Sequence, residues 1–471
     1  MENKRSYKAA LLSLGCKVNS YETEKIREDL VLKGFEIVDF SEAADVYIIN
    51  TCSVTNIADR KSRQMLHRAR SLNPDAVIVA TGCYVQTEKD KSKLDEIADI
   101  LIGNNHKGNI ADEVLVYIEK LEKGNCVSQD EINRNAFAID DIAQEKAIES
   151  FSINDYPERS RAFVRIEDGC NQFCSYCIIP YARGRVRSRK EEDILEEVKA
   201  LAEKGFKEVV LTGIHISSYG FENYEKHMKN MSDVHFDGTP LLELVSKISK
   251  TEGIERIRLG SLEPRIITRE FALGLSKIPE FCPHFHLSLQ SGCNTVLKRM
   301  NRHYSAEEFL EKCDILREVF DRPAITTDVI VGFPGETEEE FAESMDMCRK
   351  ASFAKMHIFK YSRRKGTVAD KMPGQLTEKT KHERSLKLQA LDDEMRDRYI
   401  SSFIGQEVKI LVEEEIDGYL QGLTERYVQV RCKMTRHDEE KKEKTAEGYV
   451  SSLVKIRIIK ALPDGILLGE L

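Results

Sequence analysis

The 471-residue sequence lacks any apolar run that could cross a membrane, which takes about 18 uncharged residues in a row. Residues 1–6 lead into the chain without the apolar core or cleavage site of a signal peptide, so we expect no export. The chain also lacks a surplus of positive charge, because 71 Lys and Arg face 80 Asp and Glu and leave a net charge of −9. Any nucleic-acid surface must therefore be a local patch.

Cysteine, in contrast, is plentiful, with 12 residues in a chain for which we expect no export. In a reducing compartment such thiols are available for metal binding instead of disulfides. We therefore expect a cytoplasmic location. The length and the 41% hydrophobic content are typical of a globular protein with about two to four domains.

Short apolar runs alternate with helical stretches in two parts of the chain, which predicts an α/β protein. Between 7 and 103 the alternation predicts a Rossmann-like N-terminal domain. From Phe163 onwards six apolar strands separated by helices favour a partial (β/α)6 barrel, with its site at the carboxyl ends of the strands. After Gly405 the β-rich runs predict a small antiparallel β-barrel. The expected domains are residues 1–126, a linker at 127–158, the barrel at 159–400 and the β-barrel at 401–471.

The expected strands fall into the same three groups. They are 9–14, 45–49, 76–80 and 97–102 in the first domain; 163–166, 208–211, 256–259, 284–289, 324–331 and 355–359 in the second; and 407–412, 427–432, 451–459 and 465–468 in the third.

Three cysteines follow the first barrel strand in a C-x3-C-x2-C run, Cys170, Cys174 and Cys177. Three thiolates at this spacing can hold a cubane iron–sulfur cluster and leave its fourth iron open to a small molecule. The spacing resembles that of the radical S-adenosylmethionine (SAM) enzymes. The alternative is an incomplete zinc knuckle, but structural zinc takes four ligands and no nearby His or Cys completes the set.

A second set of cysteines, Cys16, Cys52 and Cys83, is spread along the sequence, yet each residue follows an apolar strand. The carboxyl ends of parallel strands share one edge of a sheet, so we expect the three thiols to converge. Gly15 and Gly82 directly precede two of them and allow close approach of the backbone. The pattern predicts a second cluster; the alternative is three buried structural cysteines.

Three segments around these cysteines carry a family resemblance. Residues 14–24 read Leu-Gly-Cys-Lys-Val-Asn-Ser-Tyr-Glu-Thr-Glu, residues 50–56 Asn-Thr-Cys-Ser-Val-Thr-Asn, and residues 81–86 Thr-Gly-Cys-Tyr-Val-Gln. With the run at 170–177 they resemble the radical SAM methylthiotransferases over essentially the full length, the C-terminal part being a TRAM domain. The resemblance implies two [4Fe-4S] clusters, an auxiliary one on Cys16, Cys52 and Cys83 and a SAM-cleaving one on Cys170, Cys174 and Cys177.

The resemblance also implies the reaction and its partners. These enzymes insert sulfur and a methyl group at an unactivated C–H bond and use two SAM molecules per product. Gly-Cys-Lys-Val-Asn at Cys16 is similar to the branch that modifies carbon-2 of N6-threonylcarbamoyladenosine beside the tRNA anticodon. The alternatives are isopentenyladenosine in tRNA, an aspartate of a ribosomal protein, or a non-catalytic iron–sulfur RNA-binding or electron-carrying protein. We expect tRNA, SAM and an external one-electron donor as partners, and neither a membrane nor DNA.

Polar groups and glycines at successive strand ends are expected to bind SAM. Thr212-Gly213 resembles the family's site for the amino group of SAM, and the 332–337 turn suits close approach to adenine. Tyr176 shields the cluster and packs near adenine, or else serves as ordinary core. The expected cofactor-binding residues are Tyr176, Thr212, Gly213, Ser261, Glu263, Gln290, Asp328, Gly332 and Pro334.

Two basic patches in this acidic chain predict contacts with RNA phosphates. Residues 160–190 contain seven basic residues against two acidic ones, and 183–189 alternate Arg with small residues as an extended segment would. A second stripe recurs at near-helical spacing after Cys52. The expected RNA-binding residues are Arg60, Arg63, Arg70, Arg183, Arg185, Arg187 and Arg189; in the TRAM domain, which has 11 basic and 13 acidic residues, they are Lys433, Arg436, Lys455 and Arg457.

Overall fold

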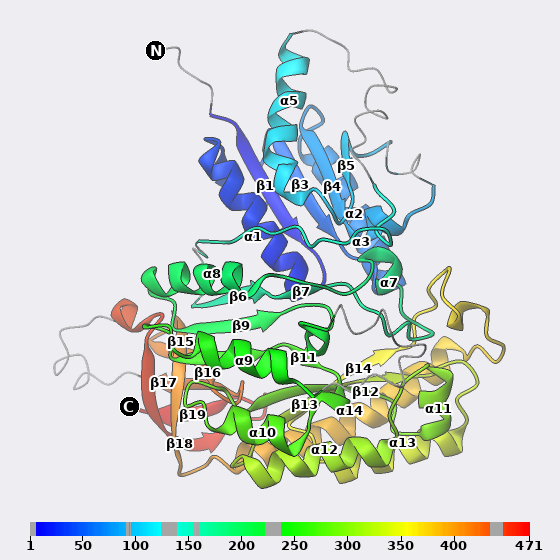
Figure 1. Ribbon diagram of the computed structural model, residues 1–471, viewed down its shortest axis with the longest axis vertical. Helices are drawn as coiled ribbons and strands as arrows, with labels where there is room; N and C mark the ends of the chain where they lie inside the picture. The colour runs from blue at the N-terminus through cyan, green and yellow to red at the C-terminus, as the bar shows by residue number, and fades with distance from the viewer. Residues whose placement is uncertain are drawn as a thin grey trace. The chain divides into compact units, whose positions relative to one another are not determined.

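The computed structural model describes residues 6–90, 94, 96–123, 139–154, 156, 160–221, 237–433 and 446–471 (Figure 1). Cys126, Arg436 and part of the expected linker lie outside this range. The chain forms two compact units. The first comprises Met1–Asp155, Glu167–Arg189 and Ser362–Asp370, and the second Tyr156–Ile166, Lys190–Tyr361 and Lys371–Leu471. No helix in the described part of the chain is both long and apolar enough to cross a membrane.

The first unit is built on a five-stranded parallel sheet in the order β2-β1-β3-β4-β5. Neighbouring residues of its central strands point to opposite faces, as the pleat requires. Tyr47 and Ile49 pack with Leu66 of α2, whereas Val46 and Ile48 pack with residues of α1 and α5. The elements are β1 Lys8–Ser13, α1 Lys17–Leu32, β2 Glu36–Val38, β3 Val46–Thr51, α2 Asn56–Leu72, β4 Val77–Gly82, α3 Cys83–Thr87, β5 Ile100–Ile102 and α5 Ile110–Glu122.

Two segments from later in the sequence complete the first unit. In one, β7 (Glu167–Asp168) pairs antiparallel with β8 (Arg187–Ser188), and the short helix α7 (Ile179–Ala182) lies between them. In the other, Arg364 donates hydrogen bonds to Ser53 Oγ at 2.7 Å and Asp59 Oδ2 at 2.7 Å, and Ala369 N–H donates to Ser175 O at 2.7 Å. The segment Ser362–Asp370 therefore contacts both the loop after Cys52 and the 170–177 loop.

The second unit contains two parallel sheets, β10-β9-β6 and β11-β12-β13-β14, whose strands alternate with helices as in a partial (β/α)6 barrel (Figure 1). Its strands are β6 Arg161–Arg165, β9 Glu208–Thr212, β10 Arg256–Leu259, β11 Ser261–Leu262, β12 His284–Gln290, β13 Ala324–Val331 and β14 Lys355–Lys360. Its helices are α8 Glu191–Glu203, α9 Thr239–Ile248, α10 Arg269–Ser276, α11 Asn294–Arg299, α12 Ala306–Val319, α13 Glu338–Ala351 and α14 Glu378–Ser401.

A closed barrel in the order β15-β16-β17-β19-β18 ends the chain. Its strands are β15 Glu407–Ile416, β16 Tyr419–Thr424, β17 Gln429–Lys433, β18 Leu453–Ala461 and β19 Leu467–Glu470. Arginines at the amino ends of the parallel strands hold it in place. Arg256 donates to the carbonyl oxygens of Leu423 and Lys409 at 3.0 and 2.6 Å. Arg258 donates to those of Glu425 and Thr424 at 2.8 and 3.3 Å.

The predicted α/β class, the two parallel series and the C-terminal β-barrel are confirmed. Five strands were missed: β2, β7, β8, β11 and β16. Of these, β7, β8 and β11 are only two residues long, which is too short to show a pattern in the sequence. β2 is only three residues long and lies at the edge of its sheet. β16 contains Gly422, where a Cβ atom would lie 2.0 Å from Leu411 O, so close strand packing there selects the residue with the weakest strand signal. The predicted domain boundaries remain a prediction.

Candidate functional site

Three neighbouring strands of the first unit bring Cys16, Cys52 and Cys83 to one edge of the sheet. Ser13 of β1 is opposite Asn50 of β3, and Thr51 of β3 is opposite Gly82 of β4. Each cysteine follows its strand within three residues. A Cβ atom on Gly15 would lie 2.6 Å from Cys52 Sγ, so the backbone before Cys16 passes directly against the Cys52 thiol.

The surroundings of Cys16 and Cys52 favour the neutral form of these two thiols when no metal is bound. Burial raises the pKa of Cys52 to about 12, and nearby Cys83 and Cys16 add to this effect. Desolvation also raises the pKa of Cys16, although part of that residue is exposed at the sheet edge. Asn104 Nδ2 donates to Cys83 Sγ at 3.5 Å. Three converging thiols with an amide donor beside them match the donor chemistry of an iron–sulfur cluster.

The loop 170–177 forms a second group of three cysteines. Gly169 has φ +85°, and a Cβ atom on it would lie 2.0 Å from Arg185 O, so the loop begins at a close contact between backbones. Cys170 N–H donates to Gly184 O at 3.1 Å, and Cys177 N–H donates to Cys174 O at 2.9 Å. Burial and the proximity of Cys174 and Cys177 raise the pKa of Cys170 well above its usual value. This donor set also fits a cluster.

Within the described ranges, no three His, Cys, Asp or Glu side chains are placed to hold a single metal ion. A four-iron cluster is larger than one ion and takes three thiolates at separate corners. The other described cysteines, Cys282, Cys293, Cys313, Cys348 and Cys432, are all buried, and no described cysteine forms a disulfide.

In the second unit, most of the residues expected to bind SAM lie at or near the carboxyl ends of barrel strands. Thr212 is the last residue of β9, Gln290 ends β12 with φ +68°, and Gly332 follows β13. Asp328 lies within β13, where its Oδ2 is 3.4 Å from His286 Nε2. The Glu263 carboxylate accepts hydrogen bonds from the backbone N–H and the Nε of Arg265, at 3.0 and 2.8 Å. Ser261 is exposed, Gly213 is half-buried and Pro334 is buried; Tyr176, in the first unit, is half-buried.

The turn at 332–337 was expected to let the backbone approach adenine, but another side chain fills the space beside Gly332. A Cβ atom there would lie 2.4 Å from Cγ of Lys381 in α14, so the glycine admits a lysine side chain. Its N–H donates to Glu336 Oε2 at 2.7 Å, which closes the turn locally. The assignment of Gly332 and Pro334 to SAM remains a prediction that needs another argument.

The expected RNA-binding segment 183–189 is wrong for three of its four arginines. Arg183, Arg187 and Arg189 are 0%, 4% and 2% exposed, and only Arg185 is exposed to solvent. Pairing of β7 with β8 folds the segment against the protein, where buried carboxylates compensate its charges. The alternation of Arg with small residues does indicate an extended segment, but the guanidinium groups of Arg183, Arg187 and Arg189 are buried and do not face water.

The stripe on α2 is partly as expected. Arg60 is exposed, and Arg63 is half-buried with its guanidinium donating to Tyr84 Oη at 3.1 Å. Arg70 is a correction, because it binds the Asp99 carboxylate at 2.8 Å and donates to the carbonyl oxygens of Pro74 and Ala76, which follow its helix. Lys61 and Arg68, which we did not single out, are exposed on the same helix. Counting every basic residue on α2 would have found them.

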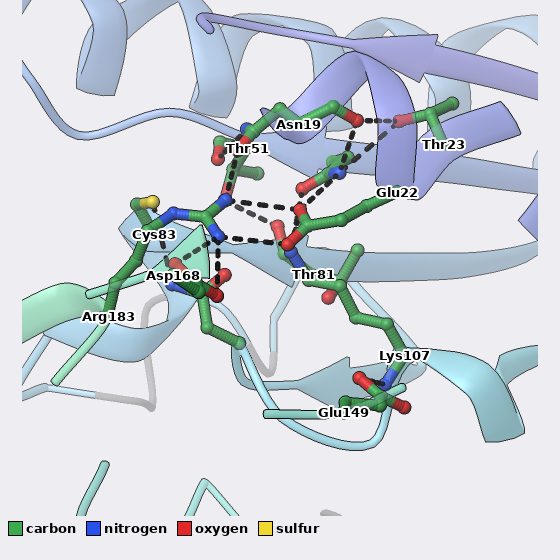
Figure 2. A network of polar contacts seen from close by, with 12 residues as sticks. Asn19, Glu22, Thr23, Thr51, Thr81, Cys83, Lys107, Glu149, Asp168 and Arg183 are labelled. Atoms are coloured by element: carbon green, nitrogen blue, oxygen red, sulfur yellow. Dashed lines mark hydrogen bonds and ion pairs between the residues drawn. The ribbon is translucent and has the colours of Figure 1, made fainter. Parts of the chain in front are cut away.

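A buried polar network links Glu22 of α1, the helix that follows Cys16, with Asp168, which precedes Cys170 (Figure 2). Arg183 lies at its centre and donates to Glu22 and Asp168, and Glu22 also pairs with buried Lys107. Arg183, Glu22 and Lys107 are each at most 1% exposed. Lone charges of this kind are costly to bury, and their mutual pairing offsets part of that cost.

Comparison with known proteins identifies two matching family models. Residues 164–348 match the Radical SAM superfamily, and residues 8–103 match the Uncharacterized protein family UPF0004. Among solved structures, the chain resembles the radical S-adenosylmethionine methyltransferase TsrM from Kitasatospora setae with cobalamin and [4Fe-4S] cluster bound. The TM-score is 0.52 at 15% identity, with 76% of this chain and 75% of that chain covered. This likeness concerns the fold alone.

Curated relatives match over nearly the whole length. The chain is 38% identical over 458 residues to the threonylcarbamoyladenosine tRNA methylthiotransferase MtaB of Bacillus subtilis, covering 96% of this chain and 94% of that protein. It is 39% identical over 425 residues to MtaB of Aquifex aeolicus, covering 90% and 96%. A tRNA-2-methylthio-N(6)-dimethylallyladenosine synthase of Caldicellulosiruptor saccharolyticus is 33% identical over 462 residues, covering 96% and 90%. With both cysteine groups and the barrel in place, the chain belongs to the radical SAM methylthiotransferase family, whose MtaB members it resembles along almost its entire length.

Proposed function

We propose that this protein is a tRNA-modifying enzyme that methylthiolates carbon-2 of N6-threonylcarbamoyladenosine next to the anticodon. The observation that carries the proposal is the presence of two groups of three cysteines in a chain that matches MtaB proteins over nearly its full length. We place the reaction in the cytoplasm, with an external one-electron donor and with neither membrane nor DNA as a partner.

Different residues of the chain bind the two clusters and orient SAM. Cys16, Cys52 and Cys83 hold the auxiliary [4Fe-4S] cluster, and Cys170, Cys174 and Cys177 hold the SAM-cleaving one. When bound, the clusters and two SAM molecules supply sulfur transfer, a methyl group and a hydrogen-abstracting 5′-deoxyadenosyl radical. Thr212 and Gln290, at strand ends of the second unit, and Asp328, within β13, orient SAM.

The tRNA phosphates bind a basic surface on α2 that we define as Arg60, Lys61 and Arg68, with Arg185 as a further contact. All four residues are exposed, and the positive charge of the surface stands out against a net charge of −9. In the C-terminal β-barrel Lys433, Lys455 and Arg457 are exposed, but the carboxylate of Glu407 is 3.0 Å from Lys455. We therefore assign the α2 surface the larger share of phosphate binding.

Anaerobic reconstitution followed by mass spectrometry of nucleosides tests this function. The chain is incubated with SAM, a one-electron donor and tRNA that carries threonylcarbamoyladenosine without the methylthio group. We expect about eight irons per chain and a methylthio-threonylcarbamoyladenosine product. The matched control is the same chain with Cys174→Ala, which should bind tRNA but form neither 5′-deoxyadenosine nor product. Product on isopentenyladenosine alone, or no RNA product with intact SAM cleavage, would overturn the substrate assignment.

A further inference from the structure

Arg183 is the most completely enclosed cation of the first unit that contacts both cysteine motifs (Figure 2). Its Nη1 donates to Glu22 Oε1 at 2.9 Å and to both oxygens of Asp168 at 3.1 Å. Its Nη2 donates to Asn19 Oδ1 at 2.6 Å and to Glu22 Oε2 at 3.1 Å. A guanidinium fork with this many fixed acceptors has one orientation.

The acceptors of Arg183 belong to different cysteine motifs. Asn19 and Glu22 lie in the first turns of α1, which begins directly after Cys16, and Asp168 lies two residues before Cys170. Cys16 and Cys170 are more than 150 residues apart in sequence. Arg183 and its partner Glu22 are 161 residues apart. The guanidinium is thus a direct bridge between the loops that carry the two groups of thiols.

Two asparagines extend this bridge to the remaining cysteines. Asn19 Nδ2 donates to Leu14 O at 2.7 Å and to Thr51 O at 2.9 Å, which fixes the residue before Cys52. Asn104 Nδ2 donates to Cys83 Sγ at 3.5 Å and to Ala182 O at 2.7 Å. Ala182 is the residue before Arg183. Every motif of the first group is therefore connected to Arg183 or to its immediate neighbour.

The Glu22 and Asp168 carboxylates are shared with two further buried cations. Lys107 pairs with Glu22, and Arg187 Nη2 lies 3.8 Å from Asp168 Oδ2. The guanidinium lies close to the first thiol, because Asn19 Oδ1, which accepts from Arg183 Nη2, also accepts from Cys16 Sγ at 3.7 Å.

We propose that Arg183 is a positioning residue for both clusters, which fixes the two cysteine loops to each other and favours the reduced state of the auxiliary cluster by its positive charge. The inference rests on the cluster ligands given under the proposed function. One electron from an external donor adds one negative charge to a cluster held by three thiolates. A fixed, buried cation beside the cluster stabilises that added charge and raises the reduction potential.

Redox titration of the reconstituted full-length chain, followed by electron paramagnetic resonance without tRNA, tests this role. The variants are Arg183→Lys, which keeps the positive charge, Arg183→Met, which removes it, and the double variant Arg183→Met with Glu22→Gln, which removes one positive and one negative charge together. The matched control is Arg258→Met with Glu208→Gln, which removes a buried pair of the second unit at 3.0 Å. Iron content and melting temperature are measured for each chain.

We expect the auxiliary midpoint potential to become more negative in Arg183→Met, and to stay nearer the wild-type value in Arg183→Lys, in the double variant and in the control. An unchanged potential in Arg183→Met, or an equal shift in the control, overturns the proposal. If Arg183→Met fails to bind iron, Arg183→Lys and the double variant decide: a potential near the wild-type value in the iron-loaded fraction of both supports the role of charge, and an equal negative shift in both contradicts it. A wild-type chain with only about four irons would instead overturn the ligand assignment.

Discussion

Single residues decide how closely the chain approaches the cysteine sulfurs. Gly15 and Gly82 both have φ +99°, in the left-handed region that side chains rarely adopt. A Cβ atom on Gly82 would lie 2.5 Å from Thr51 O, and one on Gly15 would lie 2.6 Å from Cys52 Sγ. These glycines let neighbouring strand ends approach closely: the backbone at Gly15 lies against the Cys52 thiol, and the backbone at Gly82 lies against Thr51.

Gly15→Ala therefore tests whether this packing supports cluster binding. The added methyl group displaces the Cys52 thiol, so we expect up to about four of about eight irons to be lost after reconstitution. Gly34→Ala is the matched control, because Gly34 also has φ +90° but no atom lies within 4 Å of its Cβ position. Both variants carry backbone strain of about 1–3 kcal/mol. Equal iron content in the two would contradict the packing argument.

His215 provides a prediction about pH. Burial of the imidazole, which disfavours its charged form, lowers the pKa of His215 from 6.5 to about 3, and the nearby positive charges of Arg302 and Arg265 add to this effect. The folded chain thus keeps this residue neutral where the unfolded chain takes up a proton. The stabilisation is present above pH 6.5 and is lost as the pH falls towards 3.

The measurement is the free energy of unfolding of the wild type and of His215→Asn at pH 7, 6.5 and 5. Between pH 6.5 and 5 we expect the wild type to lose about 1–2 kcal/mol more than the variant. Parallel curves for the two chains would show that His215 titrates normally in the folded state.

The sequence predicted the positions of site residues better than their surroundings. The convergence of Cys16, Cys52 and Cys83 on one edge followed from strand periodicity alone. The burial of Arg183 could not be foreseen, because Glu22, the carboxylate that binds it, is 161 residues away. An arginine that tracks phosphates and one that closes an internal network look alike until the fold brings their partners together.

At the scale of elements, the amino ends of β6, β9 and β10 form a charged base for the C-terminal β-barrel. Glu208 at the start of β9 is 0% exposed, and its carboxylate lies 3.2, 3.5 and 3.0 Å from Arg161, Arg256 and Arg258. Burial alone would raise the pKa of Glu208, but Arg258, Arg161 and Arg256 more than offset it and the pKa is lowered. One carboxylate thus organises the arginines that bind the barrel's carbonyl groups.

Glu208→Gln should destabilise the second unit by about 3–5 kcal/mol, because it leaves buried guanidinium groups without their shared anion. Glu413→Gln is the control: its side chain is 33% exposed and pairs with Arg161 at 2.9 Å, so we expect a loss of about 0–1 kcal/mol. Chemical denaturation followed by circular dichroism measures both. Because the folded pKa of Glu208 is lowered, its contribution is present above about pH 4.5 and is lost as the pH falls below this value.

The elements themselves were largely predictable from the sequence. All six main strands of the partial barrel lie where apolar runs bounded by helical stretches placed them, from β6 to β14. The apolar runs beginning with Arg256 and Glu208 were recognised as strands, but their first residues were not recognised as a docking surface. The partners of these residues are backbone carbonyls of the C-terminal barrel, such as Leu423 O, and backbone atoms leave no mark in the sequence.

At the scale of the whole molecule, an acidic chain must bind a polyanion through a small part of its surface. Changing Arg60, Lys61 and Arg68 to Glu should weaken tRNA binding and lower the slope of log Kobs against log salt by about 3. The control changes Lys199, Lys204 and Lys250 to Glu, three exposed residues of the second unit with the same change in charge. Filter binding at several salt concentrations measures both, and equal slopes for the two variants would contradict the proposed surface.

The segment Ser362–Asp370 has a consequence for the order of events during biosynthesis. The sheet that carries Cys16, Cys52 and Cys83 leaves the ribosome first, yet the loop after Cys52 obtains its bonds to Arg364 only when more than 300 further residues have been made, since the two partners are 311 residues apart. The same segment reaches Ser175 between two cysteines of the other group. Complete surroundings for either group of thiols therefore exist only in a nearly finished chain, and iron delivered earlier would meet loops that are not yet held in place.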